Sequence, residues 1–167
     1  MNRSELVAAF VDNHQAVVKY ISALPADKLH AGANGKWPPL QQLHHIWLTL
    51  VPFTKVLASK EFIREKFGTI DRPTWDNGTV IANYLRTSRK APDIYDPALA
   101  PAADVAALNE NIEAALQTIQ THLATFTEED IDTLVLPHPL LGKLTIREMF
   151  YLMSYHPLHH LKQIGGS

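Results

Sequence analysis

Cysteine is absent from this chain of 167 residues, and its absence excludes three kinds of chemistry. Without a thiol the protein forms no disulfide, offers no thiolate ligand to a metal and has no cysteine nucleophile of its own. A strong charge of either sign is also lacking, because 15 basic residues face 17 acidic ones and the formal net charge is -2. Since no basic run occurs either, we expect no nucleic-acid partner.

Long apolar runs are missing as well. No segment reaches the roughly 20 consecutive apolar residues that a membrane-spanning helix needs. The first residues, MNRSELVAAFVDNHQ, are polar and do not form the apolar core of a signal peptide. We therefore expect a cytoplasmic protein with no membrane partner, and the chain length favours a single domain over residues 1–167.

Apolar residues recur at helical spacing in four long segments, which predicts four long helices. These segments are residues 4–24, 38–59, 103–126 and 145–165. The sharpest stripe lies in the third segment, where Val105, Leu108 and Ile112 follow steps of three and four. The fourth segment begins with the sequence TIRE, in which Thr145 and Glu148 can form a capping box.

A long connection, residues 60–102, separates the second and third helices and contains four of the eleven prolines. Within it we expect one short extra helix, over residues 79–90, followed by an extended loop with the sequence APDIYDPALAPAAD. Between residues 134 and 144, Pro137, Pro139 and Gly142 favour a plain loop over a β-hairpin. The predicted fold is therefore all-α, a four-helix bundle with one long crossover between its second and third helices.

The segment SYHPLHHLKQI places three histidines within five residues on the fourth predicted helix. His156 and His160 continue the apolar stripe that faces the bundle core, one turn apart. Two imidazoles separated by four residues project from one helix face, and metal sites on helices use this spacing. His159 is rotated by about 100° from His160 and should lie on a flank with Tyr155. Pro157 removes a helical hydrogen bond and predicts a kink at the histidine pair.

A divalent metal needs at least a third ligand, and the second helix offers two candidates in WPPLQQLHHIWLTL. His44 shares a stripe with Trp47, whereas His45 shares its face with Gln41 and Gln42. The apolar stripe favours His44 as the inward residue, but a metal cavity is itself partly polar. Periodicity therefore leaves the choice between the two histidines open. A histidine on an apolar stripe is also more often a hydrogen-bonded core residue than a ligand, so spacing alone does not establish the site.

Two segments, KWPPLQQLHHIWLTL and HPLLGKLTIREMFYLMSYHPLHHLKQI, resemble the metal-bearing helices of the DinB-like superfamily, which includes the YfiT-type thiol transferases. Members of that family show a Trp followed eight residues later by a ligand His on helix two, and a YHxxHH or HxxxH element on helix four. Counting eight positions from Trp37 gives His45, and His156 and His160 fall on the other two ligand positions. A departure is Pro157, which stands between two ligands where polar residues are usual. The resemblance implies a DinB/YfiT-like bundle with a metal bound by His45, His156 and His160.

Three neutral imidazoles with one open coordination position suit a divalent ion such as zinc or nickel. The resemblance implies a transferase whose cosubstrate is a low-molecular-weight thiol, or a hydrolase that uses an ionised water molecule on a small-molecule substrate. The alternative hypothesis is a non-catalytic, stress-associated metal-binding bundle, an obligate homodimer in which the metal only joins two helices. A carboxylate base beside the open position would favour the enzyme, and the candidates are Asp12 and Glu148.

Other side chains are candidates to support the ligands. Ligating imidazoles generally donate their second nitrogen to an oxygen, and Gln41, Gln42 and Tyr155 are the residues expected to accept. The other four histidines have no partner at metal spacing, so we expect them to be structural or exposed. They are His14, His30, His122 and His138.

Overall fold

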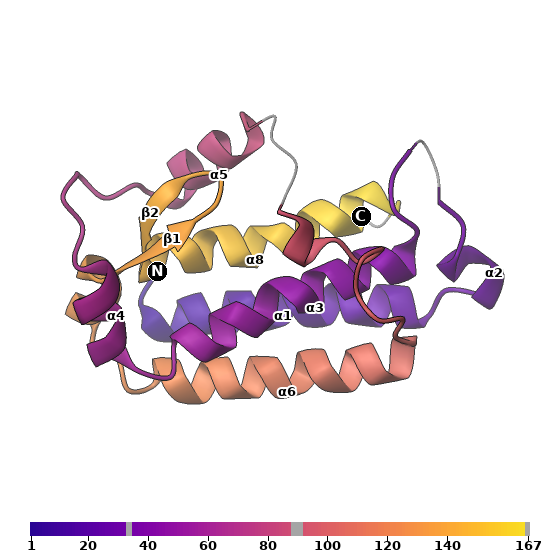
Figure 1. Ribbon diagram of the computed structural model, residues 1–167, viewed down its shortest axis with the longest axis horizontal. Coiled ribbons are helices and arrows are strands. Elements are labelled where there is room, and N and C mark those ends of the chain that lie inside the picture. The colour runs from indigo at the N-terminus through magenta and orange to yellow at the C-terminus, as the bar shows by residue number, and fades with distance from the viewer. Residues whose placement is uncertain (33–34, 88–91, 166–167) are drawn as a thin grey trace.

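The computed structural model describes residues 1–32, 35–87 and 92–165, most of which are helical. Four long helices form the bundle, and they are α1 (Arg3–Ser22), α3 (Pro39–Val56), α6 (Val105–Leu123) and α8 (Ile146–Gln163). They run along the long axis of the molecule (Figure 1), with α1 packed against α8 and α3 against α6. The predicted four-helix bundle is confirmed, and each helix begins and ends within about one turn of its expected position.

Short elements connect the bundle helices. A single turn, α2 (Ala26–Leu29), follows α1, and α7 (Glu128–Thr133) follows α6. The crossover between α3 and α6 contains α4 (Lys60–Phe67), α5 (Asn77–Leu85) and the 3-10 turn η1 (Asp93–Tyr95). The expected extra helix is α5, although it begins earlier than predicted, and residues 88–90 of the predicted range lie outside the described residues. Because α5 packs on α8 and η1 on α3, the crossover covers the two helices that carry the candidate ligands.

The segment between α7 and α8 is a β-hairpin, so the plain loop expected there is wrong. Strand β1 (Val135–His138) pairs antiparallel with β2 (Gly142–Thr145), and Pro137 lies opposite Lys143. Each strand of a two-stranded sheet is an edge, where a proline is tolerated because one side of the strand needs no partner. Gly142 has φ +74°, a conformation that glycine adopts without strain at the end of a tight turn. The residues that resembled breakers are therefore compatible with the hairpin.

The apolar stripes of the bundle helices meet in a closely packed core. Phe10 of α1, Phe53 of α3 and Phe150 of α8 form a cluster of three rings with centroids 5.1–6.1 Å apart. Tilted and edge-on ring pairs at this separation add to the stabilisation that comes from burial. None of the described helices combines the length and the apolar character needed to cross a membrane.

Glu148 fixes both the start of α8 and the position of the crossover. The predicted capping box is present, since the Thr145 hydroxyl accepts from the Glu148 amide at 3.1 Å and the Glu148 carboxylate accepts from the Thr145 amide at 2.8 Å. The same carboxylate accepts from both terminal nitrogens of Arg72, at 2.9 and 2.8 Å, and from the Trp75 amide at 2.5 Å. Burial opposes the charged form, but these hydrogen bonds outweigh it and lower the pKa of Glu148.

Candidate metal centre

Three histidines from two helices meet in the interior, between α3 and α8. His45 comes from α3, and His156 and His160 come from successive turns of α8; their exposed fractions are 4%, 7% and 6%. The Nε2 atom of His156 lies 3.1 Å from Nε2 of His45 and 3.1 Å from Nε2 of His160. One nitrogen from each of the three rings lies within 4.8 Å of the other two. The structure thus brings together the three residues that the resemblance selected.

Two hydrogen bonds fix the orientation of the outer rings of this cluster. Nδ1 of His45 donates to the backbone oxygen of Tyr95 at 2.7 Å. Nδ1 of His160 lies 3.0 Å from Oε1 of Gln42, whose amide nitrogen donates to the Trp37 oxygen at 2.8 Å and so leaves the oxygen to accept. Because both Nδ1 atoms donate, the Nε2 atoms of His45 and His160 carry free lone pairs. Gln42, one of the residues expected to accept from a ligand histidine, therefore makes the expected contact with His160.

Burial keeps all three rings neutral. It lowers the pKa of His45, and it lowers that of His160 to about 3, where the neighbouring His45 adds to the effect. It also lowers the pKa of His156 well below the ordinary value, with His160 and His45 as further causes. A neutral imidazole offers its lone pair without first losing a proton, so a metal ion meets little competition from protons at neutral pH.

The donor set fits a small divalent ion. Zinc–nitrogen distances of about 2.0–2.1 Å in a tetrahedral site place two ligand nitrogens about 3.3 Å apart, close to the 3.1 Å separations of this cluster. Without a shared cation, the lone pairs of His45 and His160 would both face Nε2 of His156, which has at most one proton to donate. A cation at the meeting point would satisfy all three Nε2 atoms, and the proton of His156 would then reside on Nδ1. That atom is buried with no hydrogen-bond partner among the described residues, unlike the second nitrogen of most ligating histidines.

The neighbours of the three histidines take other roles. His44 lies outside the cluster, since its ring is buried and stacks on Trp47 with centroids 5.9 Å apart. The structure therefore places His45, and not His44, beside the α8 histidines. His159 packs against Tyr155 on the flank of α8, as its rotation predicted, with ring centroids 6.1 Å apart. The helix continues through Pro157 to the end of α8.

Neither carboxylate proposed as a base lies at the cluster. Asp12 is exposed on α1, and Glu148 is held by Arg72 near the start of α8. The carboxylate whose charge acts on a candidate ligand is Asp96, which is buried just after η1 and tends to raise the pKa of His45 against the larger effect of burial. Sequence reasoning missed Asp96 because the crossover has no periodic pattern that would place its residues.

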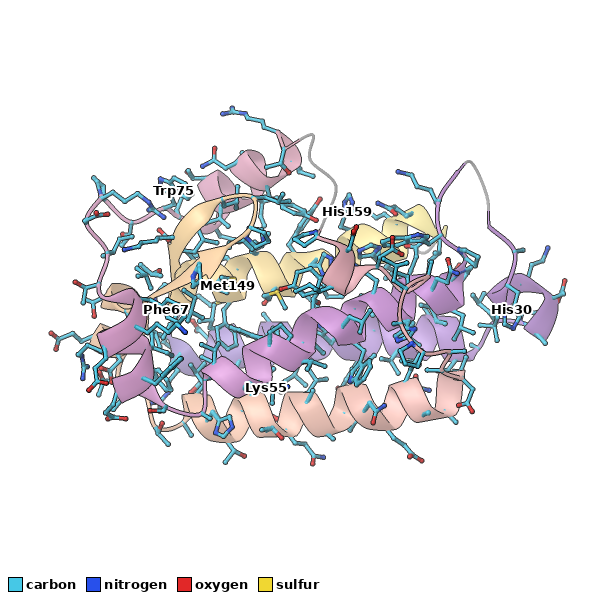
Figure 2. All side chains as sticks on the ribbon, in the orientation of Figure 1. His30, Lys55, Phe67, Trp75, Met149 and His159 are labelled. Atoms are coloured by element: carbon cyan, nitrogen blue, oxygen red, sulfur yellow. The ribbon has the colours of Figure 1, made fainter. Side chains whose placement is uncertain are left out.

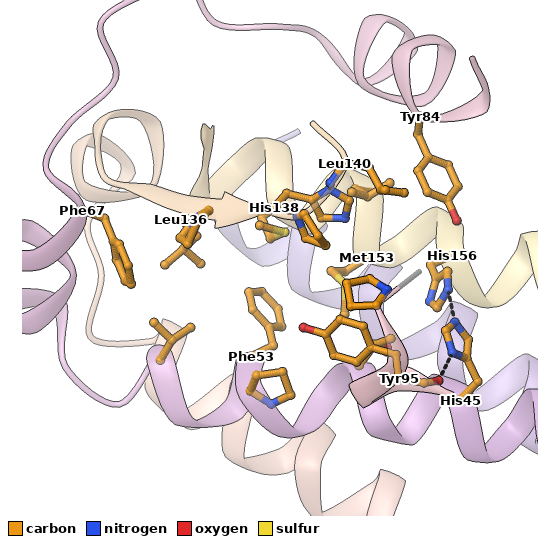
Figure 3. A pocket seen from close by; sticks show the side chains of 18 residues that line it. His45, Phe53, Phe67, Tyr84, Tyr95, Leu136, His138, Leu140, Met153 and His156 are labelled. Atoms are coloured by element: carbon orange, nitrogen blue, oxygen red, sulfur yellow. Dashed lines mark hydrogen bonds between the residues drawn. The ribbon is translucent and has the colours of Figure 1, made fainter. Parts of the chain in front are cut away.

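An apolar cavity of about 340 Å³ lies beside the three histidines (Figure 3), and His45 and His156 form part of its wall. The other walls come from α3, α8, the hairpin and the crossover, and the described lining contains no Lys, Arg, Asp or Glu. In Figure 2, Phe67 and Met149 lie toward the hairpin end of the bundle, whereas His159 lies further along α8. The cavity therefore extends from the cluster toward the hairpin.

His138, which we expected to be merely structural or exposed, also lines this cavity. Its Nδ1 accepts from the backbone amides of Leu140 and Leu141, both at 3.2 Å, in the turn of the hairpin. Burial lowers its pKa to about 4, so the ring is neutral at pH 7 and its proton resides on Nε2. The sequence signal for this arrangement is a histidine directly before a short turn, which is too general to recognise without the structure. His14, by contrast, is buried against Phe10, in keeping with the structural role expected for it.

The fold and the cluster together define a class of protein. It is a four-helix bundle with a long crossover between its second and third helices and a buried three-histidine cluster between its second and fourth helices. Residues 9–164 match the DinB superfamily, and the chain belongs to that superfamily. No curated protein matches the chain. The resemblance found in two short segments is thus confirmed over nearly the whole sequence.

Proposed function

We propose that this protein is a metal-dependent transferase that joins a low-molecular-weight thiol to a small electrophile. The proposal is carried by one observation, that His45 and His156 belong both to the three-histidine cluster and to the wall of the apolar cavity. A zinc or nickel ion held by the cluster supplies a Lewis acid with a free coordination position, which ionises a thiol or a water molecule near neutral pH. An electrophile in the cavity would lie next to that position.

The cavity favours a thiol over hydrolysis by water. The described lining holds no carboxylate, and burial lowers the pKa of His138 to about 4, which makes this ring a weak general base for activating water. With a halogenated electrophile, the thiol sulfur bonds to the electrophilic carbon and the carbon–halogen bond breaks. The halide leaves with the bonding electrons, and the thiol proton passes to solvent. Because the chain contains no cysteine, the thiol is a separate molecule.

The protein's own groups bind and orient the reactants. His45, His156 and His160 hold the ion, and the Tyr95 oxygen and Gln42 set the orientation of the two outer rings. The apolar walls exclude water from the electrophile, which protects an ionised sulfur from hydration and strengthens its electrostatic interactions.

The test combines metal analysis with a transfer assay. Protein loaded with zinc or nickel is incubated with a chloro-nitroaromatic electrophile and glutathione, cysteine or other small thiols, beside chelator-stripped protein. We expect His156→Ala and His160→Ala to lose the ion, thioether formation and thermal stability, because an ion bound only to the folded state stabilises it. His44→Ala is the matched control, since it removes a neighbouring buried imidazole that lies outside the cluster.

Each outcome of this assay has a definite meaning. Metal-dependent thioether formation with one thiol supports the transferase. Hydrolysis of an ester without added thiol would instead make the protein a hydrolase. Equal behaviour of loaded and stripped protein would refute catalysis and leave a metal-binding bundle, for which a homodimer in solution is then the state to examine. Retention of the ion by His160→Ala would refute the ligand assignment itself.

A further inference from the structure

We propose that the apolar cavity binds an uncharged, largely apolar substrate whose hydrogen-bond acceptor, such as a carbonyl oxygen, accepts from Nε2 of His138. This inference rests on the proposed function and names the class of its electrophilic substrate. The cavity volume of about 340 Å³ falls within the range of roughly 300–1,000 Å³ that is usual for small-molecule sites.

The lining of the cavity selects against charge. The described lining holds no Lys, Arg, Asp or Glu, and His138, which stands apart from the three-histidine cluster, is neutral because burial lowers its pKa to about 4. An ionised ligand group placed along these walls would lose its hydration without gaining a counter-charge. A ligand whose body is uncharged loses little on entering.

The walls also suit an apolar body of variable shape. Figure 3 shows Phe53 projecting from α3, Leu136 from the hairpin and Met153 from α8. Met149 also lines the α8 side. Methionine side chains are unbranched and polarizable, so they adapt to ligands of different outline. Figure 3 shows His45 and His156 at one end of this space and Phe67 at the other. A bound ligand therefore extends from the metal centre toward the hairpin.

His138 supplies a hydrogen-bond donor of fixed position in this apolar space. The amides of Leu140 and Leu141 both occupy its Nδ1, so the ring cannot shift its proton there without losing two hydrogen bonds. Among the described residues no protein group accepts a hydrogen bond from Nε2, and the ring lines the cavity. Because His138 is half-buried, a ligand that fills the cavity displaces water from Nε2, and an acceptor such as a carbonyl oxygen replaces the hydrogen bond that is lost.

The three methionines of the chain provide the experiment. Met149 and Met153 line the cavity, whereas Met1 is 56% exposed and serves as an internal reference. Chelator-stripped protein labelled with ¹³C at the methionine methyl groups is titrated with acetophenone, ethylbenzene and benzoate. We expect saturable shifts of the Met149 and Met153 methyl signals with the two uncharged probes, no such shifts with benzoate, and no change at Met1.

The role of His138 is tested by comparing the two uncharged probes. His138→Leu should weaken acetophenone binding roughly three- to tenfold, the net contribution of one neutral hydrogen bond, and leave ethylbenzene binding unchanged. The matched control is His122→Leu, which removes a half-buried histidine of α6 that does not line the cavity. In unmodified protein, the Nε2–H signal of His138 should move with acetophenone and not with ethylbenzene, which tests the contact even if the variant folds poorly.

Contrary results would overturn the inference at separate points. Absence of saturable shifts at both cavity methionines, or benzoate binding as tight as that of acetophenone, refutes the uncharged apolar ligand class. Equal loss of both uncharged probes in His138→Leu refutes the hydrogen bond. Because these titrations use stripped protein, their failure is distinct from failure of the transferase proposal, which would appear as lost metal binding or as turnover that does not depend on metal.

Discussion

Replacing Arg72 with methionine should be one of the most destabilising changes outside the metal centre. Arg72 donates two hydrogen bonds to Glu148, at 2.9 and 2.8 Å, and Glu148 is only 1% exposed. The Arg72 guanidinium also lies 3.7 Å from the ring centroid of Trp75. Methionine keeps much of the aliphatic bulk above that ring and removes the charge, so the variant chiefly reports the loss of the ion pair.

The magnitude follows from the burial of the two partners. Removing one member of a buried pair typically costs about 3–5 kcal/mol, because a charge is left buried without compensation. Here the Arg72 side chain is 25% exposed, and the amides of Trp75 and Thr145 still bind the carboxylate. We therefore expect a loss near the lower limit, about 3 kcal/mol of the free energy of unfolding.

Arg64→Met is the matched control for this measurement. Arg64 pairs with Asp130 at 3.1 Å but its side chain is 52% exposed, and Lys60 also binds that carboxylate at 3.0 Å. An exposed pair of this kind contributes about 0–1 kcal/mol. Urea unfolding at pH 7 gives both values, and equal losses for the two variants would show that burial of Glu148 does not govern the energetics.

The effect of Arg72→Met should also depend on pH. Burial opposes ionisation of Glu148, but Arg72 and the amides lower its pKa overall. A lowered carboxyl pKa contributes stability above the ordinary value, and this contribution is lost as the pH falls through the lowered pKa. The difference between wild type and Arg72→Met should therefore shrink as the unfolding experiment is repeated at increasingly acidic pH. A constant difference would argue against the ion pair as its source.

Two further substitutions test Gln42, which contacts a candidate metal ligand, and His14, which is fully buried. Gln42→Leu removes the acceptor of the His160 Nδ1 proton and should weaken metal binding about 10- to 100-fold. Competition with a chromophoric chelator measures the metal affinity, and an unchanged affinity would show that Gln42 does not orient His160. Burial lowers the pKa of His14 to about 4, although its bond to the Phe10 oxygen acts in the opposite direction. His14 should consequently contribute a loss of stability of up to about 3 kcal/mol as the pH drops from about 6.5 to about 4. His138 and His160, whose pKa values burial also lowers, add to the loss, so His14→Leu should reduce the slope in urea unfolding with chelator present, and an unchanged slope would show that His14 does not contribute.

The bundle could be predicted because each long helix has its own local signal. The stripe of α6 and the capping box of Thr145 and Glu148 depend only on residues that are close in sequence. The hairpin lacked such a signal, because Pro137 argues against a strand until the register shows that the strand is an edge. Short helices such as α4 and α7 are likewise stabilised mainly by contacts with the rest of the fold, which periodicity does not reveal.

The candidate site, like the fold, was predictable only where the signal lies in residues close in sequence. Spacing indicated His156 and His160, but only the family resemblance favoured His45 over His44, since both lie on a helix that is buried over much of its surface. Tyr95, Asp96 and His138 were missed because their positions depend on how the crossover and the hairpin fold back over α3 and α8. The hydrogen bond between His45 and Tyr95, for example, joins residues 50 positions apart.

Tyr95 contacts both the candidate metal centre and the cavity. Its backbone oxygen accepts from Nδ1 of His45, and Tyr95 also lines the cavity in which we place the substrate. Burial raises the pKa of the Tyr95 phenol, so the side chain stays neutral beside an uncharged ligand. A ligand that shifts the Tyr95 backbone would also move the oxygen that orients His45, and a metal that fixes His45 would limit that shift. If the cluster holds a metal and the cavity a substrate, as we propose, Tyr95 would couple the two sites, and such coupling is reciprocal, so each ligand would alter the affinity for the other.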